Sequence, residues 1–363
     1  MSGAVTAYAG YGTMTSLIAD AQTVRQRMDR LTTQASTGLV AQTYAGLGSG
    51  ASVSLSLRPQ IAAMGVWQAN INAATGTMGV TQTAMTQLQS IASNFRAQLD
   101  TLNGLAPSNV DTLAASARQA LAQVAGLLDT TDGSTYVFGG ADSTNPPVPN
   151  PDAIGSSGFA TQIGTAVAGL AGAGASATAA ATLAIAGSNA AGTSPFSAYM
   201  SQPATALQAG IAQVQTGAGQ TQAVGLLASA NTYAVSSGSS TTGSWARDLL
   251  RALATIGSLS SAQIGASGFQ GLVQDTYTSL TGVVSATANE AGVLGNQQTA
   301  LTGVGTQLQD QVTALTAQVS PAENVDMAQT LSSLTLVQTQ LQSSYQLISG
   351  QSALSLVKFL PIG

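Results

Sequence analysis

Apolar residues recur at alternating steps of four and three along much of this 363-residue chain. That spacing lines one face of an α-helix and is typical of coiled-coil packing. The pattern therefore predicts a mainly α-helical protein. The longest run spans 64–102, and further runs lie near both chain ends. The N-terminal run consists of Leu17, Ala21, Val24, Met28, Leu31 and Ala35.

Breaks in this pattern divide the first half of the chain into helices. A glycine-rich segment, 46–50, follows the first run and predicts a hinge. The helix over 64–102 should end near Gly104 and Pro107. A third apolar stripe, over 110–127, predicts the next helix.

The middle of the chain has a different character. A proline-rich tract at 146–149 is followed by a segment rich in Ala, Gly, Ser and Thr that runs to about Gly192. Short strands are predicted at 222–227 and 231–235. We interpret 136–244 as an insertion of β-structure and loops.

The second half mirrors the first. Residues 273–315 again carry a seven-residue repeat, apolar at every position except Thr287, which predicts a second long helix. Ser320 to Glu323 reads as a capping box with proline at the first helical position, which predicts that a new helix starts there. The apolar stripe of that last helix is Met327, Leu331, Leu334, Gln338, Leu341, Tyr345 and Ile348.

The elements thus form a palindrome of short helix, long helix, insertion, long helix and short helix. The simplest fold pairs the first helix with the last and the second with the penultimate. We expect a discontinuous, long antiparallel helical rod with coiled-coil-like termini and a small β/loop insertion domain at its tip. The predicted parts are a terminal coiled-coil assembly domain (1–44 and 320–363), a helical rod domain (45–135 and 245–319) and an outward-facing variable insertion (136–244).

Composition excludes several functions. The chain has neither Cys nor His, so thiol nucleophiles, disulfides, histidine bases and the usual zinc sites are excluded. Nine basic residues against fourteen acids leave no basic patch for nucleic acid. The acids are scattered, and the pair Asp129 and Asp132 reads as a turn beside Gly133. We therefore predict a protein that is not an enzyme and has no cofactor, metal site or nucleic-acid partner.

Charge also bears on solubility and targeting. Only 6% of the residues are charged, against about 25% in an average protein, and such a surface repels its own copies weakly. The first basic residue is Arg25, so we expect no cleaved signal peptide. We find no apolar run of about 18 residues and expect no membrane insertion.

Both ends of the chain resemble the flagellin and hook-associated protein family. Near the N-terminus, RLTTQASTGL at 30–39 resembles the family's RLSSGLR region, and TQTAMTQL at 81–88 resembles QTAEGAL. Near the C-terminus, ENVDMA at 323–328 resembles VDxA. QTQLQSSY at 338–345 and LSLVKFL at 354–360 resemble the closing QTxLQASY…LSLxxxL. The acidic DDPAG stretch that the family carries after the first of these motifs is missing here.

The resemblance implies a mechanism as well as a fold. A subunit of this family leaves the cell through the flagellum-specific type III exporter, and its terminal helices pack as coiled coil in the extracellular flagellum. The implied partners are further copies of the chain, neighbouring flagellar axial proteins and a flagellar export chaperone. The residues expected at the assembly interface are Leu17, Val24, Met28, Leu31, Met327, Leu331, Leu334, Leu341, Tyr345 and Ile348.

Two kinds of flagellar subunit fit this resemblance. Tyr136-Val137-Phe138-Gly139-Gly140, followed by the proline-rich tract, resembles the hook–filament junction protein, and filament flagellin is the alternative. A non-flagellar surface adhesin or a glycan-binding protein fits less well. An adhesin would be expected to carry a cleavable signal, and a glycan binder needs clustered aromatic residues, which make up only 4% of the chain.

Overall fold

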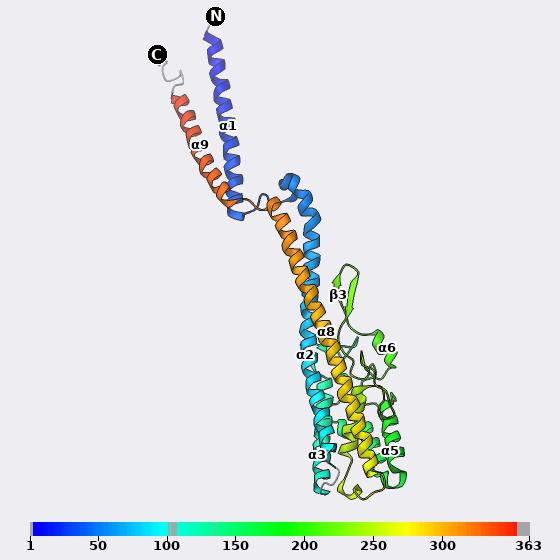
Figure 1. Cartoon of the computed structure of the whole chain (residues 1–363). Coiled ribbons are helices and arrows are strands. Elements are labelled where there is room, and N and C mark those ends of the chain that lie inside the picture. The colour runs from blue at the N-terminus through cyan, green and yellow to red at the C-terminus, as the bar shows by residue number, and fades with distance from the viewer. Residues whose placement is uncertain (1–2, 101, 103–106, 134, 354–363) are drawn as a thin grey trace. The chain divides into compact units, whose positions relative to one another are not determined.

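A computed structural model describes residues 3–100, 102, 107–133 and 135–353. Long helices dominate it, and two small antiparallel hairpins are its sheets, which confirms the mainly α-helical class (Figure 1). The chain forms two compact units. We call 1–65 with 309–363 the terminal unit and 66–308 the central unit. The predicted division into assembly, rod and insertion domains stays a prediction.

The α-helices are α1 (Gly3–Thr37), α2 (Ala51–Asp100), α3 (Pro107–Leu128), α4 (Gly158–Ala168), α5 (Leu170–Gly187), α6 (Ala204–Ala209), α7 (Trp245–Gly257), α8 (Phe269–Glu323) and α9 (Met327–Ala353). The short 3₁₀ helices are η1 (Tyr44–Gly50), η2 (Ile154–Ser156) and η3 (Ser261–Gln263). The strands are β1 (Thr131–Asp132), β2 (Thr135–Tyr136), β3 (Gln213–Gly217) and β4 (Gln220–Ala223), with β1 paired to β2 and β3 to β4.

Helices α2 and α8 run antiparallel in the central unit. The Gln82 amide donates to the carbonyl of Ala291 at 3.2 Å, and the Gln298 amide donates to the carbonyl of Thr75 at 3.3 Å. Residue numbers fall along one helix as they rise along the other, as predicted. The heptad positions of both helices form the buried core, among them Ile71, Met78, Met85, Leu99, Leu280, Leu294 and Leu301.

One predicted helix boundary is wrong. The capping box expected at Ser320 does not form, because α8 continues through Pro321 and ends at Glu323. Pro321 removes one backbone hydrogen bond of α8, and the helix ends two residues later. Asp326 starts α9 instead, because its carboxylate accepts hydrogen bonds from the N–H groups of Ala328 (2.9 Å) and Gln329 (3.1 Å).

The insertion holds more helix than the sequence analysis expected. Helices α4 and α5 occupy the small-residue tract that we interpreted as loops. Alanine has the highest helix propensity, so an alanine-rich tract can form a helix even without a regular apolar stripe. The predicted strand at 222–227 corresponds only in part to β4, which pairs with β3 across a turn at Gly219.

The other predicted strand, 231–235, is a loop held by one carboxylate. Glu290 is fully buried on α8 and accepts hydrogen bonds from the backbone N–H groups of Thr232 (2.6 Å), Tyr233 (3.1 Å) and Ala234 (3.2 Å). These three N–H groups are therefore not available to pair with a neighbouring strand. Burial raises the pKa of Glu290, and the three donors oppose that shift.

Helix α5 is long and apolar enough to cross a membrane by length and composition alone. Its backbone breaks at Gly174, where φ is 78° and ψ is 168°. The regular part after the break has roughly 13 residues, or about 20 Å, against a hydrocarbon core of about 30 Å. Helix α5 also packs against α4 and α7. Both features favour a place in the folded central unit, where 22% of the helix is buried.

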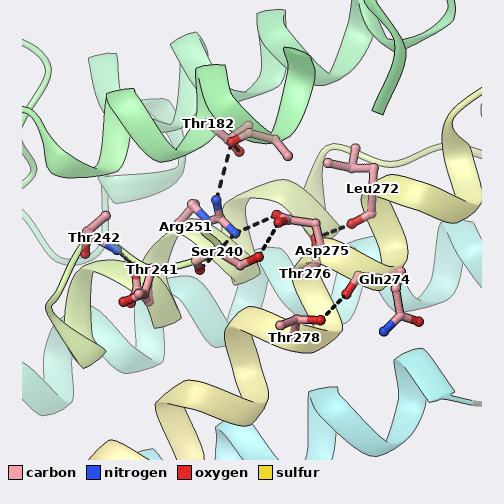
Figure 2. A network of polar contacts seen from close by, with 12 residues as sticks. Thr182, Ser240, Thr241, Thr242, Arg251, Leu272, Gln274, Asp275, Thr276 and Thr278 are labelled. Atoms are coloured by element: carbon pink, nitrogen blue, oxygen red, sulfur yellow. Dashed lines mark hydrogen bonds and ion pairs between the residues drawn. The ribbon is translucent and has the colours of Figure 1, made fainter. Parts of the chain in front are cut away.

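All thirteen residues of α7 are buried, including three charged ones. The Arg251 guanidinium pairs with the Asp275 carboxylate of α8 at 2.7 Å, and the Ser240 hydroxyl donates to the same carboxylate at 2.6 Å (Figure 2). Removing either partner would leave a buried charge unpaired, which costs several kcal/mol. This pair therefore fixes α7 against α8.

Asp129 follows α3 and fixes the proline-rich tract. Its carboxylate accepts a hydrogen bond from the Val148 N–H at 2.8 Å. Burial raises the pKa of Asp129 from 3.8 to about 6. Since the folded-state pKa is raised, the contribution of Asp129 to stability is fully present below about pH 4 and is lost as pH rises through 6.

We predict that Asp129→Asn removes the loss of stability that titration of Asp129 causes between about pH 4 and pH 6. The amide oxygen of Asn can accept the same hydrogen bond without carrying a charge. The melting temperature of the wild type, measured relative to this variant from pH 4 to pH 7.5, should therefore fall as pH rises. A constant difference in melting temperature between the two proteins from pH 4 to pH 7.5 would contradict the raised pKa of Asp129.

Candidate assembly interface

The terminal unit pairs the two ends of the chain. Helices α1 and α9 lie side by side and run antiparallel (Figure 1). Of the α1 stripe, Ala21 is buried, and Leu17, Val24, Met28 and Leu31 are half-buried. Most other α1 side chains from Thr15 to Thr37 are exposed. The predicted α1 stripe is thus the face that meets α9.

Helix α9 has an apolar face wider than α1 covers. One flank of this face, which includes Thr330, Val337 and Leu341, is buried. Leu334 and Ile348 lie along the middle of the face and are half-buried. The other flank is exposed, and we call it the uncovered flank: Met327 is 41% exposed, Leu331 50% and Tyr345 48%.

The ten predicted interface residues therefore fall into two groups. Seven lie in or beside the α1–α9 contact, and three form the uncovered flank. The sequence pattern did not separate these groups, because residues of both groups belong to the same seven-residue repeat. Side-chain exposure separates them, and it leaves the uncovered flank accessible to another chain.

A short backbone crossing joins the two helices at their inner ends. Leu39 and Asn324 form an antiparallel bridge. Beside it, the Val40 N–H donates to the carbonyl of Glu323 at 2.7 Å, and the Val325 N–H donates to the carbonyl of Gly38 at 2.9 Å. Gly38 has a φ of 73°, which favours glycine and ends α1. The two linkers are thus fixed to each other.

The Glu323 side chain strengthens this crossing. Its carboxylate accepts hydrogen bonds from the Ser54 hydroxyl (2.5 Å) and the Arg58 Nε (3.0 Å), and it forms an ion pair with Arg58 Nη2. The hydrogen bond from Arg58, which has the largest effect, and the one from Ser54 lower the pKa of Glu323. The sequence analysis placed Glu323 in a capping box, because nothing local indicates partners more than 260 residues away.

The remaining acids and glycines of interest have structural roles. Asp132 accepts a hydrogen bond from the Thr77 hydroxyl at 2.5 Å, in the turn predicted beside Gly133. The glycine-rich segment 46–50 lies in the 3₁₀ helix η1, with φ of 57° at Gly48. Within the described residues, no group of three or more acids could hold a metal ion. The described part of the chain thus shows no constellation typical of an active site.

We predict that Glu323→Gln loosens the crossing without unfolding the helices. The amide keeps the shape of the side chain but loses the charge that Arg58 pairs with, at a cost of about 1 kcal/mol for such a half-exposed pair. Hydrogen exchange at the Val40 and Val325 amides should become about fivefold faster. Arg58→Gln should have the same effect, and the double variant should add little to it. Additive effects of the two changes would show that the pair is not coupled.

Comparison with known families gives two matches at the two ends of the chain. Residues 13–141 match the bacterial flagellin N-terminal helical region, and residues 278–360 match the bacterial flagellin C-terminal helical region. Together these matches cover more than half of the chain and include all ten predicted interface residues. A comparison with curated proteins finds no match. The chain therefore belongs to the bacterial flagellin family.

Proposed function

We propose that this chain is exported and polymerises through its paired terminal helices as a subunit of the hook–filament junction. The flagellin family consists of structural, non-enzymatic proteins that are exported and build the extracellular flagellum. The flagellin matches therefore support a flagellar structural subunit. The mode of assembly and the position in the flagellum are the parts that we propose.

The uncovered flank is the observation that carries the proposed mode of assembly. Exposed apolar surface gains about 25 cal/mol for each Å² that a neighbour covers. Met327 and Leu331 lie about one turn apart, and Tyr345 lies about four turns further along the same face, so a helix of another copy could cover all three. Repetition of such a contact between copies builds a helical tube.

The polar surface of α9 supports the same proposal. No Asp, Glu, Lys or Arg occurs between Met327 and Ala353, and Ser, Thr and Gln supply the polar groups. Packing between copies would therefore require no charge to leave water, which is the most expensive step in forming a buried contact. An export chaperone could shield the same surface before secretion.

The segment 136–140 supports the junction position. Its Tyr-Val-Phe-Gly-Gly sequence and the proline-rich tract at 146–149 resemble the junction protein. In the structure, Phe138 is fully buried and meets the Trp245 ring edge-on, with 6.4 Å between ring centroids. The segment thus connects the flagellin-like N-terminal region to the insertion in a fixed conformation.

We predict that Leu331→Asp blocks assembly and spares the subunit. Leu331 is half-exposed in the single chain, so the free energy of unfolding should change by less than about 0.5 kcal/mol. In an assembled contact the carboxylate would be buried without a partner, at a cost of several kcal/mol per copy. Cells should secrete the variant into the medium and lose motility, as measured by immunoblotting and swimming assays.

Two further variants make this test specific. Ser332→Asp adds the same charge about 100° around the helix, at an exposed position, and should assemble normally. Leu341→Asp lies in the buried flank, so it should also weaken the pairing of α1 with α9 inside one chain. Normal polymerisation of the Leu331→Asp protein would overturn the proposed mode of assembly.

Immunogold electron microscopy tests the position. Antibodies against the insertion should label the boundary between hook and filament, and deletion of the gene should leave bare hooks while filament flagellin accumulates in the medium. Label along the whole filament would assign the chain to filament flagellin instead. Intact motile flagella in the deletion strain, without label in the wild type, would argue for a surface adhesin.

A further inference from the structure

A polar cavity of about 350 Å³ lies in the central unit, apart from the terminal helices. Its wall combines the end of α5, helix α6 with the residues just before it, the segment 229–236 and the start of α7. Amide and hydroxyl groups dominate the lining. They belong to Asn189, Gln202, Gln208, Asn231, Ser229, Ser236, Thr242 and Ser244.

Arg247 is the charged residue in this wall. Arg247 is only 7% exposed. Nε donates to the carbonyl of Ser229 at 2.9 Å, and Nη1 donates to the carbonyls of Ala186 (3.0 Å) and Ser188 (3.2 Å). Nη2 donates to the Asn189 side-chain oxygen at 2.6 Å. These acceptors are all neutral, and they use four of the five guanidinium N–H groups.

Arg251, on the same helix, is a buried arginine with a structural role and provides a comparison for Arg247. It lies one turn further along α7 and pairs with the Asp275 carboxylate at 2.7 Å (Figure 2). No comparable ion pair with Arg247 occurs in the part of the chain that the structure describes. The Arg247 guanidinium also lies over the Phe196 ring, 5.2 Å from its centroid. The ring and the neutral acceptors offset only part of the cost of burying a cation, and an anion in the cavity would lower that cost further.

Asp248 is the acid nearest to Arg247 in the sequence, but its carboxylate has other partners. It accepts hydrogen bonds from the Thr241 hydroxyl and, at 2.8 Å, from the Thr242 N–H. Asp248 contributes to the electrostatic field around Arg247 without forming an ion pair with it. The hydrogen-bond acceptors of the Arg247 guanidinium are therefore carbonyl and amide oxygens, and none of them is a carboxylate.

We propose that this cavity binds a small hydroxylated carboxylate, with the carboxylate held at Arg247 and the hydroxyl groups held by the surrounding amides and hydroxyls. The fifth guanidinium N–H, on Nη2, can donate a charge-assisted hydrogen bond to a carboxylate. The amides of Asn189 and Gln208 offer both donors and acceptors, which suits hydroxyl groups. The volume is in the range of small-molecule sites, about 300–1,000 Å³.

The test uses the full-length chain and three matched probes. Gluconate carries a carboxylate and a row of hydroxyls, sorbitol has the hydroxyls without the charge, and acetate has the charge without the hydroxyls. Isothermal titration calorimetry should show binding of gluconate, with sorbitol and acetate at least tenfold weaker. Absence of gluconate binding, or equal binding of sorbitol, would overturn the proposal.

Asn189→Asp provides the matched variant. It places a carboxylate where Arg247 now has an amide oxygen, so the chain supplies the missing counter-ion itself. The melting temperature should rise or stay unchanged, and gluconate affinity should fall at least tenfold. Asn150→Asp adds the same charge at an exposed position that does not line this cavity, and it should bind gluconate like the wild type.

The variants also separate a binding site from a structural arginine. If Arg247 only holds the fold together, Asn189→Asp would change stability and leave no anion affinity to lose. Full gluconate affinity in Asn189→Asp would place any binding elsewhere and overturn the assignment. Neither result depends on assembly, which uses the terminal unit.

Discussion

One helix can cover only part of the apolar face of its partner, and that limit shapes the terminal unit. The face of α9 extends from Val337 through Leu334 to Leu331, and α1 packs against the first part of it. The remainder is exposed to water in the single chain. A fold that buried the whole face within one subunit would leave none of this face for assembly. The incomplete pairing of α1 with α9 is thus the structural basis of the proposed polymerisation.

Scarcity of charge shapes the rest of the molecule. With 6% charged residues, surface ion pairs contribute little, and the few buried charges determine local geometry. The Glu323 carboxylate joins the end of α8 to α2, Arg251 with Asp275 fixes α7 against α8, and Glu290 holds a loop of the insertion. Arg251 and Glu290 are buried in low-dielectric surroundings, where a hydrogen bond or ion pair constrains geometry more than it would in water.

The sequence predicted most of the helical architecture because seven-residue repeats leave a clear periodic signal. The buried positions from Ile71 to Leu99 and the antiparallel order of the long helices follow from it. Helix α5 was missed because a tract of small residues has high helix propensity but no apolar stripe. The helix start predicted at Pro321 was wrong, since a proline can lie near the end of a helix as well as at its beginning. The partners of Glu323 and Arg247 were out of reach, because tertiary contacts bring them together from distant segments.

The contact of Glu290 with the insertion has a consequence for how such a protein can change over time. Glu290 binds the backbone N–H groups of residues 232–234 and does not depend on their side chains. Any residue except proline supplies the same N–H group. The contact with Glu290 therefore tolerates substitutions in the loop. Backbone recognition by one buried carboxylate separates the stability of the attachment from the identity of the attached sequence.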